Sequence, residues 1–162
     1  MTQIKSTIRK ASEGDFSVIN ALIRENYLLY HKNIPEFYKK APKKVFSLGT
    51  YLNLLEDKNT LVIVAILNEE IVGVLYAFID HLAEDDSTYG LSRSEIYELS
   101  VKSKYRRQGV GSELLIEAEK WSKLNKADDI SAICYGFNNK AMYFYKNNMY
   151  DPYSIKFKKR LK

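Results

Sequence analysis

The amino-acid sequence predicts an α/β fold in which helices cover both faces of a mixed, mainly antiparallel sheet of six to seven strands. Two β-branched apolar runs, 61–67 and 71–79, are separated by a short polar turn, which predicts a hairpin. Two further apolar runs, 96–101 and 130–136, flank an amphipathic helix. A helix between two strands favours a right-handed crossover, so this second pair of strands is expected to be parallel.

The length and composition of the chain indicate one globular domain, which we expect to span residues 1–162. This length suffices for one good hydrophobic core but not for two ordinary domains. With 46% hydrophobic and 28% charged residues, the composition favours neither a disordered nor a fibrous protein. The longest apolar run is far shorter than the roughly 20 residues of a membrane helix, and no secretion leader follows Met1. A cytoplasmic protein with no membrane partner is therefore expected.

The two ends of the chain complete the predicted sheet and its helices. Residues 6–11 are expected to form the opening strand, and Ser12 with the acidic residues after it signals the start of the first helix. Pro42 is expected to begin the second helix. Residues 31–41, between these helices, have no periodicity. Residues 153–158 alternate between apolar and polar side chains and predict a terminal strand.

The sharpest functional signal is a glycine-bearing loop between the predicted central strand and the helix after it. Gly109 and Gly111 flank Val110 at the helix start, where missing side chains let a ligand approach the backbone. The N–H groups of the first helical turn have no intrahelical partner, and the helix dipole makes this end positive. Arg106 and Arg107 add two full charges. The loop therefore predicts a site for a phosphate or pyrophosphate group.

Two common phosphate-binding motifs do not match this loop. A P-loop needs a lysine and a hydroxyl residue directly after its second glycine, but Ser112 and Glu113 stand there. A dinucleotide-binding fingerprint needs a third glycine, and Leu114 occupies its position. The loop instead has the order Arg-x-x-Gly-x-Gly after a Leu-x-Val strand end. A second block follows downstream and reads Asn138-Asn139-Lys140-Ala141-Met142-Tyr143-Phe144-Tyr145.

Together the two blocks resemble the GNAT N-acetyltransferase superfamily, and the order of elements is similar over nearly the whole chain. The first block resembles the family's acetyl-CoA loop, and the second resembles its Asn-x-x-Ala-x-x-Phe-Tyr helix. The sequence departs from the family where Met149 and Tyr150 replace the usual Gly-Phe. The resemblance implies an acyl-CoA N-acyltransferase fold, in which the central strand splays from its parallel neighbour. It also implies acetyl-CoA as cosubstrate and an amine as acceptor.

The resemblance further implies which residues bind the cofactor. Backbone groups of the central strand would bind pantetheine, and the Val101 N–H would face the thioester oxygen. Asn138 would contact the pantetheine arm, or else it only caps its helix. The expected cofactor-binding residues are Leu99, Val101, Arg106, Arg107, Gln108, Gly109, Val110, Gly111, Ser112, Asn138 and Tyr145.

Acetyl transfer to an amine also needs a base for the amine and an acid for the departing thiolate. Glu98 is the first choice for the base, because a glutamate on so apolar a strand is unusual, and Glu95 is the second choice. Tyr145 occupies the family's general-acid position, and a phenol with a pKa of about 10 can donate to a thiolate whose conjugate acid has a pKa of about 8.5. The alternatives are a structural glutamate and a core tyrosine. Cys134, without an activating histidine, is interpreted as a small buried hydrophobe.

Strand alternation and the unpatterned 31–41 segment predict the acceptor side of the site. The residues expected on one face of the central strand are Tyr97, Leu99 and Val101, and those on the other face are Ile96, Glu98 and Ser100. In the resembled family the segment between the first two helices walls the acceptor site. The expected wall residues are Tyr27, Tyr30, Phe37 and Tyr38, with the acidic residues 84–86 near the mouth. A small primary amine or a peptide amine is the expected acceptor.

The net charge of +5 leaves other classes of function to weigh. Much of the excess lies in the last seven residues and is typical of a solvated basic tail. Without a zinc finger, a helix-turn-helix or an RNP signature, nucleic-acid binding is the disfavoured alternative. A non-catalytic acyl-CoA sensor or partner-binding module is the other alternative. The two histidines and one cysteine have no ligand spacing, so no metal is expected, and a homodimer is left open.

Overall fold

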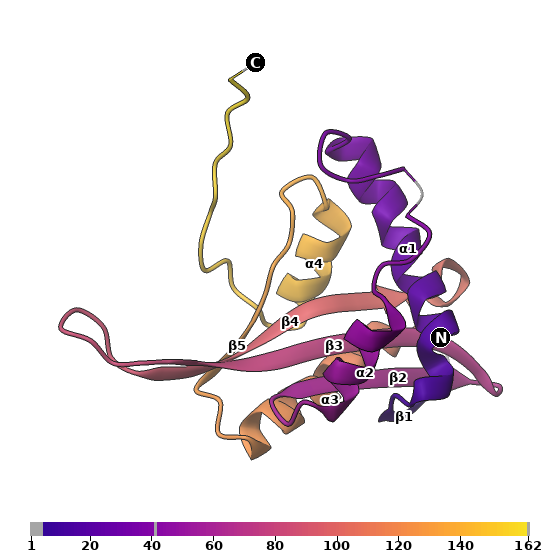
Figure 1. Ribbon diagram of the computed structural model, residues 1–162, viewed down its shortest axis with the longest axis horizontal. Helices are drawn as coiled ribbons and strands as arrows, with labels where there is room; N and C mark the ends of the chain where they lie inside the picture. Colours follow the sequence, from indigo (N-terminus) through magenta and orange to yellow (C-terminus); the bar gives the residue numbers. More distant parts are fainter. Residues whose placement is uncertain (1–4, 41, 162) are drawn as a thin grey trace.

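The computed structural model describes residues 5–40 and 42–161 and contains a five-stranded sheet with helices on both faces (Figure 1). The strands are β1 (Thr7–Lys10), β2 (Thr60–Leu67), β3 (Glu70–Leu82), β4 (Leu91–Val101) and β5 (Asp129–Ala132). The helices are α1 (Phe16–Asn33), α2 (Leu48–Glu56), α3 (Val110–Leu124) and α4 (Asn139–Asn147). The strands follow one another in sequence order across the sheet, antiparallel from β1 to β4 and parallel between β4 and β5. The predicted fold class is confirmed, with fewer strands among the described residues than expected.

β2 and β3 form the predicted hairpin around a tight turn. Asn68 and Glu69 both have positive φ, 49° and 63°. This backbone conformation gives the turn a twist that matches the right-handed twist of the two strands. Most of β2 and the first half of β3 are buried, so this hairpin forms the centre of the hydrophobic core.

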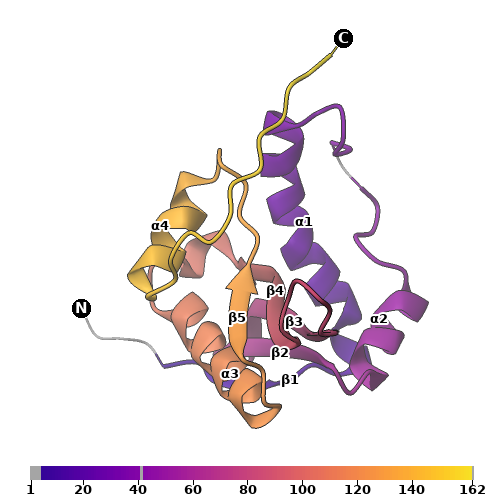
Figure 2. The same cartoon turned by 90° about the vertical axis from the view of Figure 1, so that its left-hand side faces the viewer.

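The sheet separates two hydrophobic clusters, with α3 and α4 on one side and α1 and α2 on the other (Figure 2). Leu114 of α3 packs in the cluster that includes Leu75, whereas Ile23 of α1 packs in the cluster that includes Val64. All four side chains are 2% exposed or less, and burying such a side chain contributes about 1.5 to 3 kcal/mol. The helical spacing predicted for α1 and α3 therefore reflects packing against the sheet.

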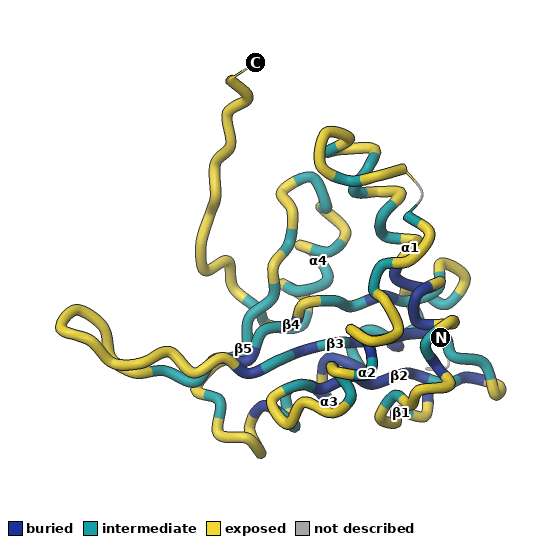
Figure 3. Tube along the Cα trace, in the orientation of Figure 1, coloured by how far each residue is buried: buried dark blue, intermediate teal, exposed yellow. Residues whose placement is uncertain are grey.

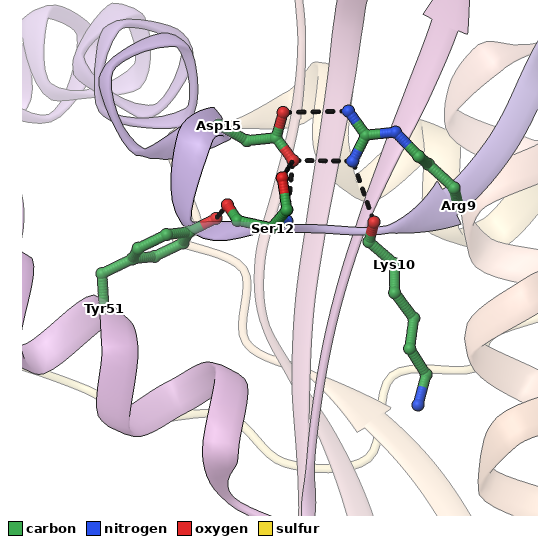
Figure 4. A network of polar contacts seen from close by, with 5 residues as sticks. All are labelled: Arg9, Lys10, Ser12, Asp15 and Tyr51. Carbon is green, nitrogen blue, oxygen red and sulfur yellow. Dashed lines mark hydrogen bonds and ion pairs between the residues drawn. The ribbon is translucent and has the colours of Figure 1, made fainter.

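A polar network fixes the start of α1 to β1 and α2 (Figure 4). The Asp15 carboxylate accepts hydrogen bonds from the Ser12 N–H at 2.7 Å and from both terminal nitrogens of Arg9 at 2.6 and 2.9 Å. The hydrogen-bonded Arg9 guanidinium lowers the pKa of Asp15 to about 2. Tyr51 of α2 donates to the Ser12 carbonyl at 2.7 Å. The helix-start signal at Ser12 is therefore confirmed. Ser12 caps one turn of 3₁₀ helix (Glu13–Asp15), which leads directly into α1.

Two sequence predictions about the ends of elements are wrong. The second helix begins at Leu48 and not at Pro42, because Ser47 supplies the cap: its hydroxyl accepts the Thr50 N–H at 3.0 Å. Residues 153–158 are not a strand, and the whole segment 151–161 is exposed and without regular structure (Figure 3). Alternating side chains make a strand only where another strand supplies backbone partners, and no described strand pairs with this segment.

Candidate active site

The open edge of the site arises where β4 and β5 part. The two strands pair over only four residues each, 93–96 with 129–132, while β4 continues to Val101. β5 ends at Ala132, and among the described strands the remainder of β4 pairs with β3 alone. The splayed parallel pair is therefore present.

The backbone N–H groups of Leu99 and Val101 point to this open edge, as the contact of the next residue, Lys102, shows. The Lys102 N–H donates to the Val72 carbonyl of β3 at 2.8 Å. Because successive N–H groups along a strand point to opposite edges, the N–H groups of Leu99 and Val101 are directed away from β3. The Val101 carbonyl accepts a hydrogen bond from Arg106 Nε at 2.7 Å. Leu99 and Val101 thus lie as the sequence predicts, with N–H groups facing the gap.

A β-bulge interrupts β4 beside this gap. Tyr76 of β3 pairs with Glu98, and the next residue, Ala77, pairs with Ile96. Tyr97 is therefore the extra residue on β4. A bulge offsets the alternation of side chains, so the residues before and after it no longer keep their expected faces.

The bulge overturns the predicted distribution of side chains along β4. Ile96 packs on the α3 side together with Leu99, whereas Tyr97 lies against Tyr76 of the α1 side, with ring centroids 5.3 Å apart. Glu98 hydrogen-bonds a residue of α1. The predicted faces of Tyr97 and Ile96 are therefore wrong, whereas Leu99 shares a face with Val101, and Glu98 with Ser100, as expected. Because of the extra residue, the consecutive side chains of Tyr97 and Glu98 both lie on the α1 side of the sheet.

Glu98 lies in a small polar cluster between β4 and α1. Its Oε1 accepts hydrogen bonds from Asn26 Nδ2 and from Ser100 Oγ, both at 2.7 Å, and Asn26 Nδ2 also lies 2.6 Å from Ser100 Oγ. Burial raises the pKa of Glu98, although these hydrogen bonds and the Leu99 N–H act in the opposite direction. The carboxyl group therefore holds a proton at a pH at which an ordinary glutamate has lost it, which brings it closer to the range useful for a base.

Asn26 and Ser100 are functional candidates that the sequence analysis missed. The core-facing positions of α1 follow helical spacing through Ile19 and Ile23 to Asn26 and Tyr30. A polar residue on this otherwise apolar stripe was the available signal. Glu95, the second choice for the base, pairs with Phe78 and Ser131 and makes no hydrogen bond to the Glu98 cluster among the described residues.

The glycine loop forms the start of α3. Gly109 has a φ of 94°, a left-handed conformation that suits glycine, and the first intrahelical hydrogen bond runs from the Glu113 N–H to the Gly109 carbonyl at 3.0 Å. The N–H groups of Val110, Gly111 and Ser112 consequently have no partner within the helix. No side chain caps this end. The start of α3 therefore has free N–H groups, and its binding of an anion stays a prediction.

The charged and polar residues of the loop differ in the contacts that they make. Besides the Val101 carbonyl, Arg106 contacts Glu25 of α1 at 3.5 Å, so its guanidinium joins β4 to α1. Gln108 donates to the Lys104 carbonyl at 2.9 Å and shapes the loop. Arg107 is exposed and has a φ of 62°. Among the described residues, Arg106 is hydrogen-bonded to the end of β4, and Arg107 is not.

The two sequence blocks meet where α4 packs on the start of α3. A Cβ atom added to Gly111 would lie 3.1 Å from the Phe144 ring. The missing side chain thus allows the close approach of the two helices. Asn138 caps α4, its side-chain oxygen accepting the Ala141 N–H at 3.2 Å, as the alternative interpretation proposed. This bond leaves the Asn138 amide nitrogen available for another contact.

Tyr145 of α4 packs against the hydrophobic cluster on the α3 side of the sheet. Burial, together with the nearby charge of Glu98, raises the pKa of Tyr145. The phenol therefore stays protonated throughout the working pH range. The turn after α4 also forms despite the departure from Gly-Phe: the Tyr150 N–H donates to the Tyr145 carbonyl at 3.0 Å, and Met149 adopts a φ of 66°.

A cluster of tyrosines joins α1 to the segment after β5. The Tyr38 and Tyr135 hydroxyls are 2.7 Å apart, and the Tyr30 ring lies 5.0 Å from that of Tyr38 and 5.6 Å from that of Tyr135. Tyr27 lies 5.5 Å from Tyr38, again between ring centroids. Burial raises the pKa of Tyr27 and Tyr30, and so does the charge of Glu98, which places the cluster beside the carboxylate. Three of the four predicted wall residues are thus together.

The remaining expectations about the acceptor side need correction. Phe37 is 74% exposed and lies at the rim of the cluster, while Tyr135 and Phe137, which stack at 5.2 Å, were missed. Residues 84–86 lie at the tip of the β3–β4 hairpin, far from the cluster (Figure 1). The seven residue-to-residue steps from Leu91 to Glu98 alone span roughly 23 Å. The acidic loop therefore does not border the site.

Cys134 lies beside Tyr145, and its thiol is not activated. Burial raises the pKa of Cys134, which keeps the thiol protonated. His31 Nδ1 contacts the Tyr38 carbonyl at 2.7 Å. Cys134 is half-buried, and not fully buried as expected.

Comparison with protein families identifies the class of this site. The model of the acetyltransferase (GNAT) family matches residues 26–149, more than half of the chain. The chain therefore belongs to the GNAT family of acetyltransferases, whose members typically use acetyl-CoA for acyl transfer. No curated protein sequence matches the chain. No helix among residues 5–40 and 42–161 is long and apolar enough to cross a membrane.

Solved structures share the fold at low sequence identity. The tetramutant of the BH1408 protein from Bacillus halodurans has a TM-score of 0.91 at 17% identity, covering 96% of this chain and 99% of that one. A transcriptional regulator from Bacillus halodurans C-125 has a TM-score of 0.78 at 24% identity, covering 97% and 100%. An aminoglycoside acetyltransferase, meta-AAC0020 from an uncultured soil metagenomic sample, in complex with sisomicin, has a TM-score of 0.68 at 22% identity, covering 97% of both chains.

The raised pKa of Glu98 predicts a pH-dependent cost in stability. The pKa of Glu98 is higher in the folded than in the unfolded protein. The free energy of unfolding is therefore highest below the unfolded pKa, where Glu98 is protonated in both states, and it falls as pH rises through the folded pKa. Glu98→Gln should therefore raise the melting temperature at neutral pH and have less effect near pH of about 4, below the unfolded pKa. Glu95→Gln is the matched control. An effect of Glu98→Gln that is the same at both pH values would contradict the assignment.

Proposed function

We propose that this protein is an N-acetyltransferase that transfers the acetyl group of acetyl-CoA directly to an amine. The observation that carries the proposal is the length of β4 left open after its pairing with β5 ends, and three further features support it. These are the anion-binding start of α3, the carboxyl group of Glu98 and the hydroxyl of Tyr145. Membership in the GNAT family supports acyl transfer in general.

Acetyl-CoA would bind between the two sequence blocks. Its pyrophosphate would accept hydrogen bonds from the unpartnered N–H groups of Val110, Gly111 and Ser112, assisted by the helix dipole and the exposed Arg107. The pantetheine amides would continue the hydrogen bonding of β4 where β5 is missing, at Leu99 and Val101. The thioester would then lie near Tyr145 of α4.

The proposed reaction has a single acyl-transfer stage. Glu98 takes a proton from the acceptor ammonium, directly or through water, and the neutral nitrogen attacks the thioester carbon. The Val101 N–H stabilises the negative charge that develops on the carbonyl oxygen. The carbon–sulfur bond breaks, and Tyr145 donates a hydrogen bond and then its proton to the thiolate. The nitrogen of the adduct loses its second proton to water, and the Glu98 proton returns to Tyr145 through solvent. The products are the acetylated amine, CoA and one released proton.

The tyrosine cluster supports a cationic acceptor. The faces of tyrosine rings attract ammonium groups by about 0.5 to 2 kcal/mol, and the cluster lies beside the Glu98 carboxylate. A carboxylate both attracts an ammonium group and accepts its proton. One solved structure with this fold is an aminoglycoside acetyltransferase in complex with sisomicin. We propose a small primary amine or a peptide amine as the acceptor.

Acetyl-CoA should raise the melting temperature of the protein by roughly 5–10 °C at about 100 times its dissociation constant. Ser112→Asp should abolish this rise, because its carboxylate would lie against the pyrophosphate while an acidic residue in the first helical turn keeps α3 stable. Ser17→Asp makes the same change in the exposed first turn of α1 and should leave the rise intact. Gly111 is a poorer test, because any side chain there meets Phe144. An unchanged wild-type melting curve at millimolar acetyl-CoA would remove the cofactor assignment.

Tyr145→Phe should lower kcat by about 10²- to 10⁴-fold, because the thiolate that its hydroxyl serves exists only late in the reaction. The affinity for acetyl-CoA, followed by thermal shift, should change little. Tyr143→Phe, on the exposed side of the same helix, should retain the rate. Full activity of Tyr145→Phe with the best acceptor would reduce the tyrosine to a packing role.

Glu98→Gln should lower the rate most below the pKa of the acceptor, where the amine arrives protonated and needs a base. The measurement is release of free CoA with a panel of cationic, neutral and anionic acceptors across pH, with Glu95→Gln as the control. Cationic amines should be the best substrates. A changed pH profile in Glu95→Gln alone would move the base to Glu95, and acetyl-CoA binding without CoA release for any acceptor would favour the sensor.

A further inference from the structure

The three polar side chains between α1 and β4 form a closed ring of hydrogen bonds that contacts only one oxygen of Glu98. Asn26 Nδ2 donates to Glu98 Oε1 at 2.7 Å and to Ser100 Oγ at 2.6 Å. Ser100 Oγ donates to the same Oε1 at 2.7 Å. Among the described residues, no side chain hydrogen-bonds Oε2. The two oxygens of this carboxyl group are therefore in different environments.

The sequence brings these side chains together through the periods of a strand and a helix. Glu98 and Ser100 are two positions apart on β4, after the bulge, so both face α1. On α1, Asn26 follows the buried Ile23 by three positions, which places it on the stripe that packs on the sheet. The ring thus lies where α1 packs on β4.

The hydrogens of the ring determine where Glu98 can carry a proton. An asparagine amide nitrogen has two hydrogens, and a serine hydroxyl has one. Asn26 gives one hydrogen to each partner, and Ser100 gives its own to Oε1. A proton on Oε1 would face two donors and no acceptor. The proton that Glu98 gains therefore belongs on Oε2.

Burial makes these two donors important for the charged form of Glu98. Ser100 is 2% exposed, so water cannot replace its hydroxyl. Burial raises the pKa of Glu98, and the hydrogen bonds from Ser100 and Asn26 are the largest effects in the opposite direction. The ring therefore keeps this pKa below that of a carboxyl group buried without donors.

The titratable side chains that face Glu98 from α1, β3 and α4 are phenols. They are those of Tyr27, Tyr30, Tyr76 and Tyr145. Burial raises the pKa of all four, so they stay neutral in the range in which a carboxyl group titrates. Glu25, next to Asn26 on α1, is exposed and lies 3.5 Å from Arg106. A proton exchanged within this cluster therefore belongs to Glu98.

We propose that Asn26 and Ser100 are positioning residues that hold Glu98 through Oε1 and leave Oε2 as the atom that takes the proton of the acceptor amine. This inference rests on the proposed function, since the proton comes from the amine that is acetylated. The amine, or a water molecule between, approaches Oε2. The ring stays intact throughout the reaction, because neither Asn26 nor Ser100 gives up a proton.

Carbon-13 NMR of the side-chain carboxyl groups measures the pKa of Glu98 without any substrate, and Glu98→Gln identifies its signal. Ser100→Ala and Asn26→Leu should each raise this pKa by about one unit, the change expected when a hydrogen bond to a charged group is lost. Ser100→Thr keeps the hydroxyl and should keep the pKa. Ser94→Ala is the matched control, because it removes another buried hydroxyl of β4, one that contacts Ser122, and it should leave the pKa of Glu98 unchanged.

CoA release across pH tests the role of the ring in acetyl transfer. Only the charged form of Glu98 can take a proton, so kcat/KM should fall as the pH drops below its pKa. Ser100→Ala and Asn26→Leu should move this fall upward by about one pH unit, which lowers kcat/KM about tenfold at low pH and less at high pH. Ser94→Ala should leave the profile in place. A merely structural role would lower the melting temperature without moving the fall.

Three results would overturn the inference, and they differ in what else they affect. If neither Ser100→Ala nor Asn26→Leu changes the pKa of Glu98, the ring does not act on the carboxyl group, and acetyl transfer is unaffected. If this pKa rises but the fall in kcat/KM does not follow it, Oε2 of Glu98 is not the atom that takes the amine proton. If the wild type releases CoA with no amine while the pKa still rises in the variants, the proposed function itself fails, and the ring only keeps a buried carboxyl group charged.

Discussion

The early separation of β5 from β4 is the constraint on which the candidate site depends. Backbone N–H groups left without partners in a protein interior cost about as much as a lost hydrogen bond, so a sheet normally pairs them. Here the pairing of β4 with β5 stops after residues 93–96, while β4 continues to Val101. The N–H groups of Leu99 and Val101 therefore need a partner from outside the sheet. The proposed extended, amide-bearing arm of acetyl-CoA is chemically suited to be that partner.

The bulge at Tyr97 is the second constraint, and it sets the chemistry of the acceptor side. Without the extra residue, Ile96 and Glu98 would share a face of β4; with it, Ile96 stays in the α3 cluster while Glu98 meets Asn26 of α1. Burying a carboxyl group there raises its pKa and weakens the fold at neutral pH. The proposed role of Glu98 as a base depends on this burial, since an ordinary surface glutamate is too weak a base for an ammonium proton.

The sequence predicted those parts of the fold and site that depend on local patterns. The hairpin turn at Asn68, the start of α3 at Gly109 and the cap of α4 at Asn138 each follow from neighbouring residues. The errors came where tertiary contacts decide. The bulge at Tyr97 depends on the register with β3, and the alternating pattern of 153–158 cannot say whether a partner strand is within reach. Tyr135 joined the site through a contact with Tyr38, 97 positions away, that no local pattern encodes.

The electrostatic relation between Glu98 and Tyr145 links the two ends of the proposed reaction. Burial is the main cause that raises the pKa of Tyr145, and the negative charge of Glu98 adds to it, which makes the phenol a poor acid before the amine arrives. When Glu98 takes the proton of the amine, its charge is neutralised and this contribution disappears. Tyr145 thus becomes a stronger acid at the stage when the carbon–sulfur bond breaks and a thiolate forms. In the proposed mechanism, proton uptake by Glu98 therefore lowers the pKa of Tyr145 before the thiolate forms. The order of the two proton transfers follows from the position of the Glu98 carboxyl group.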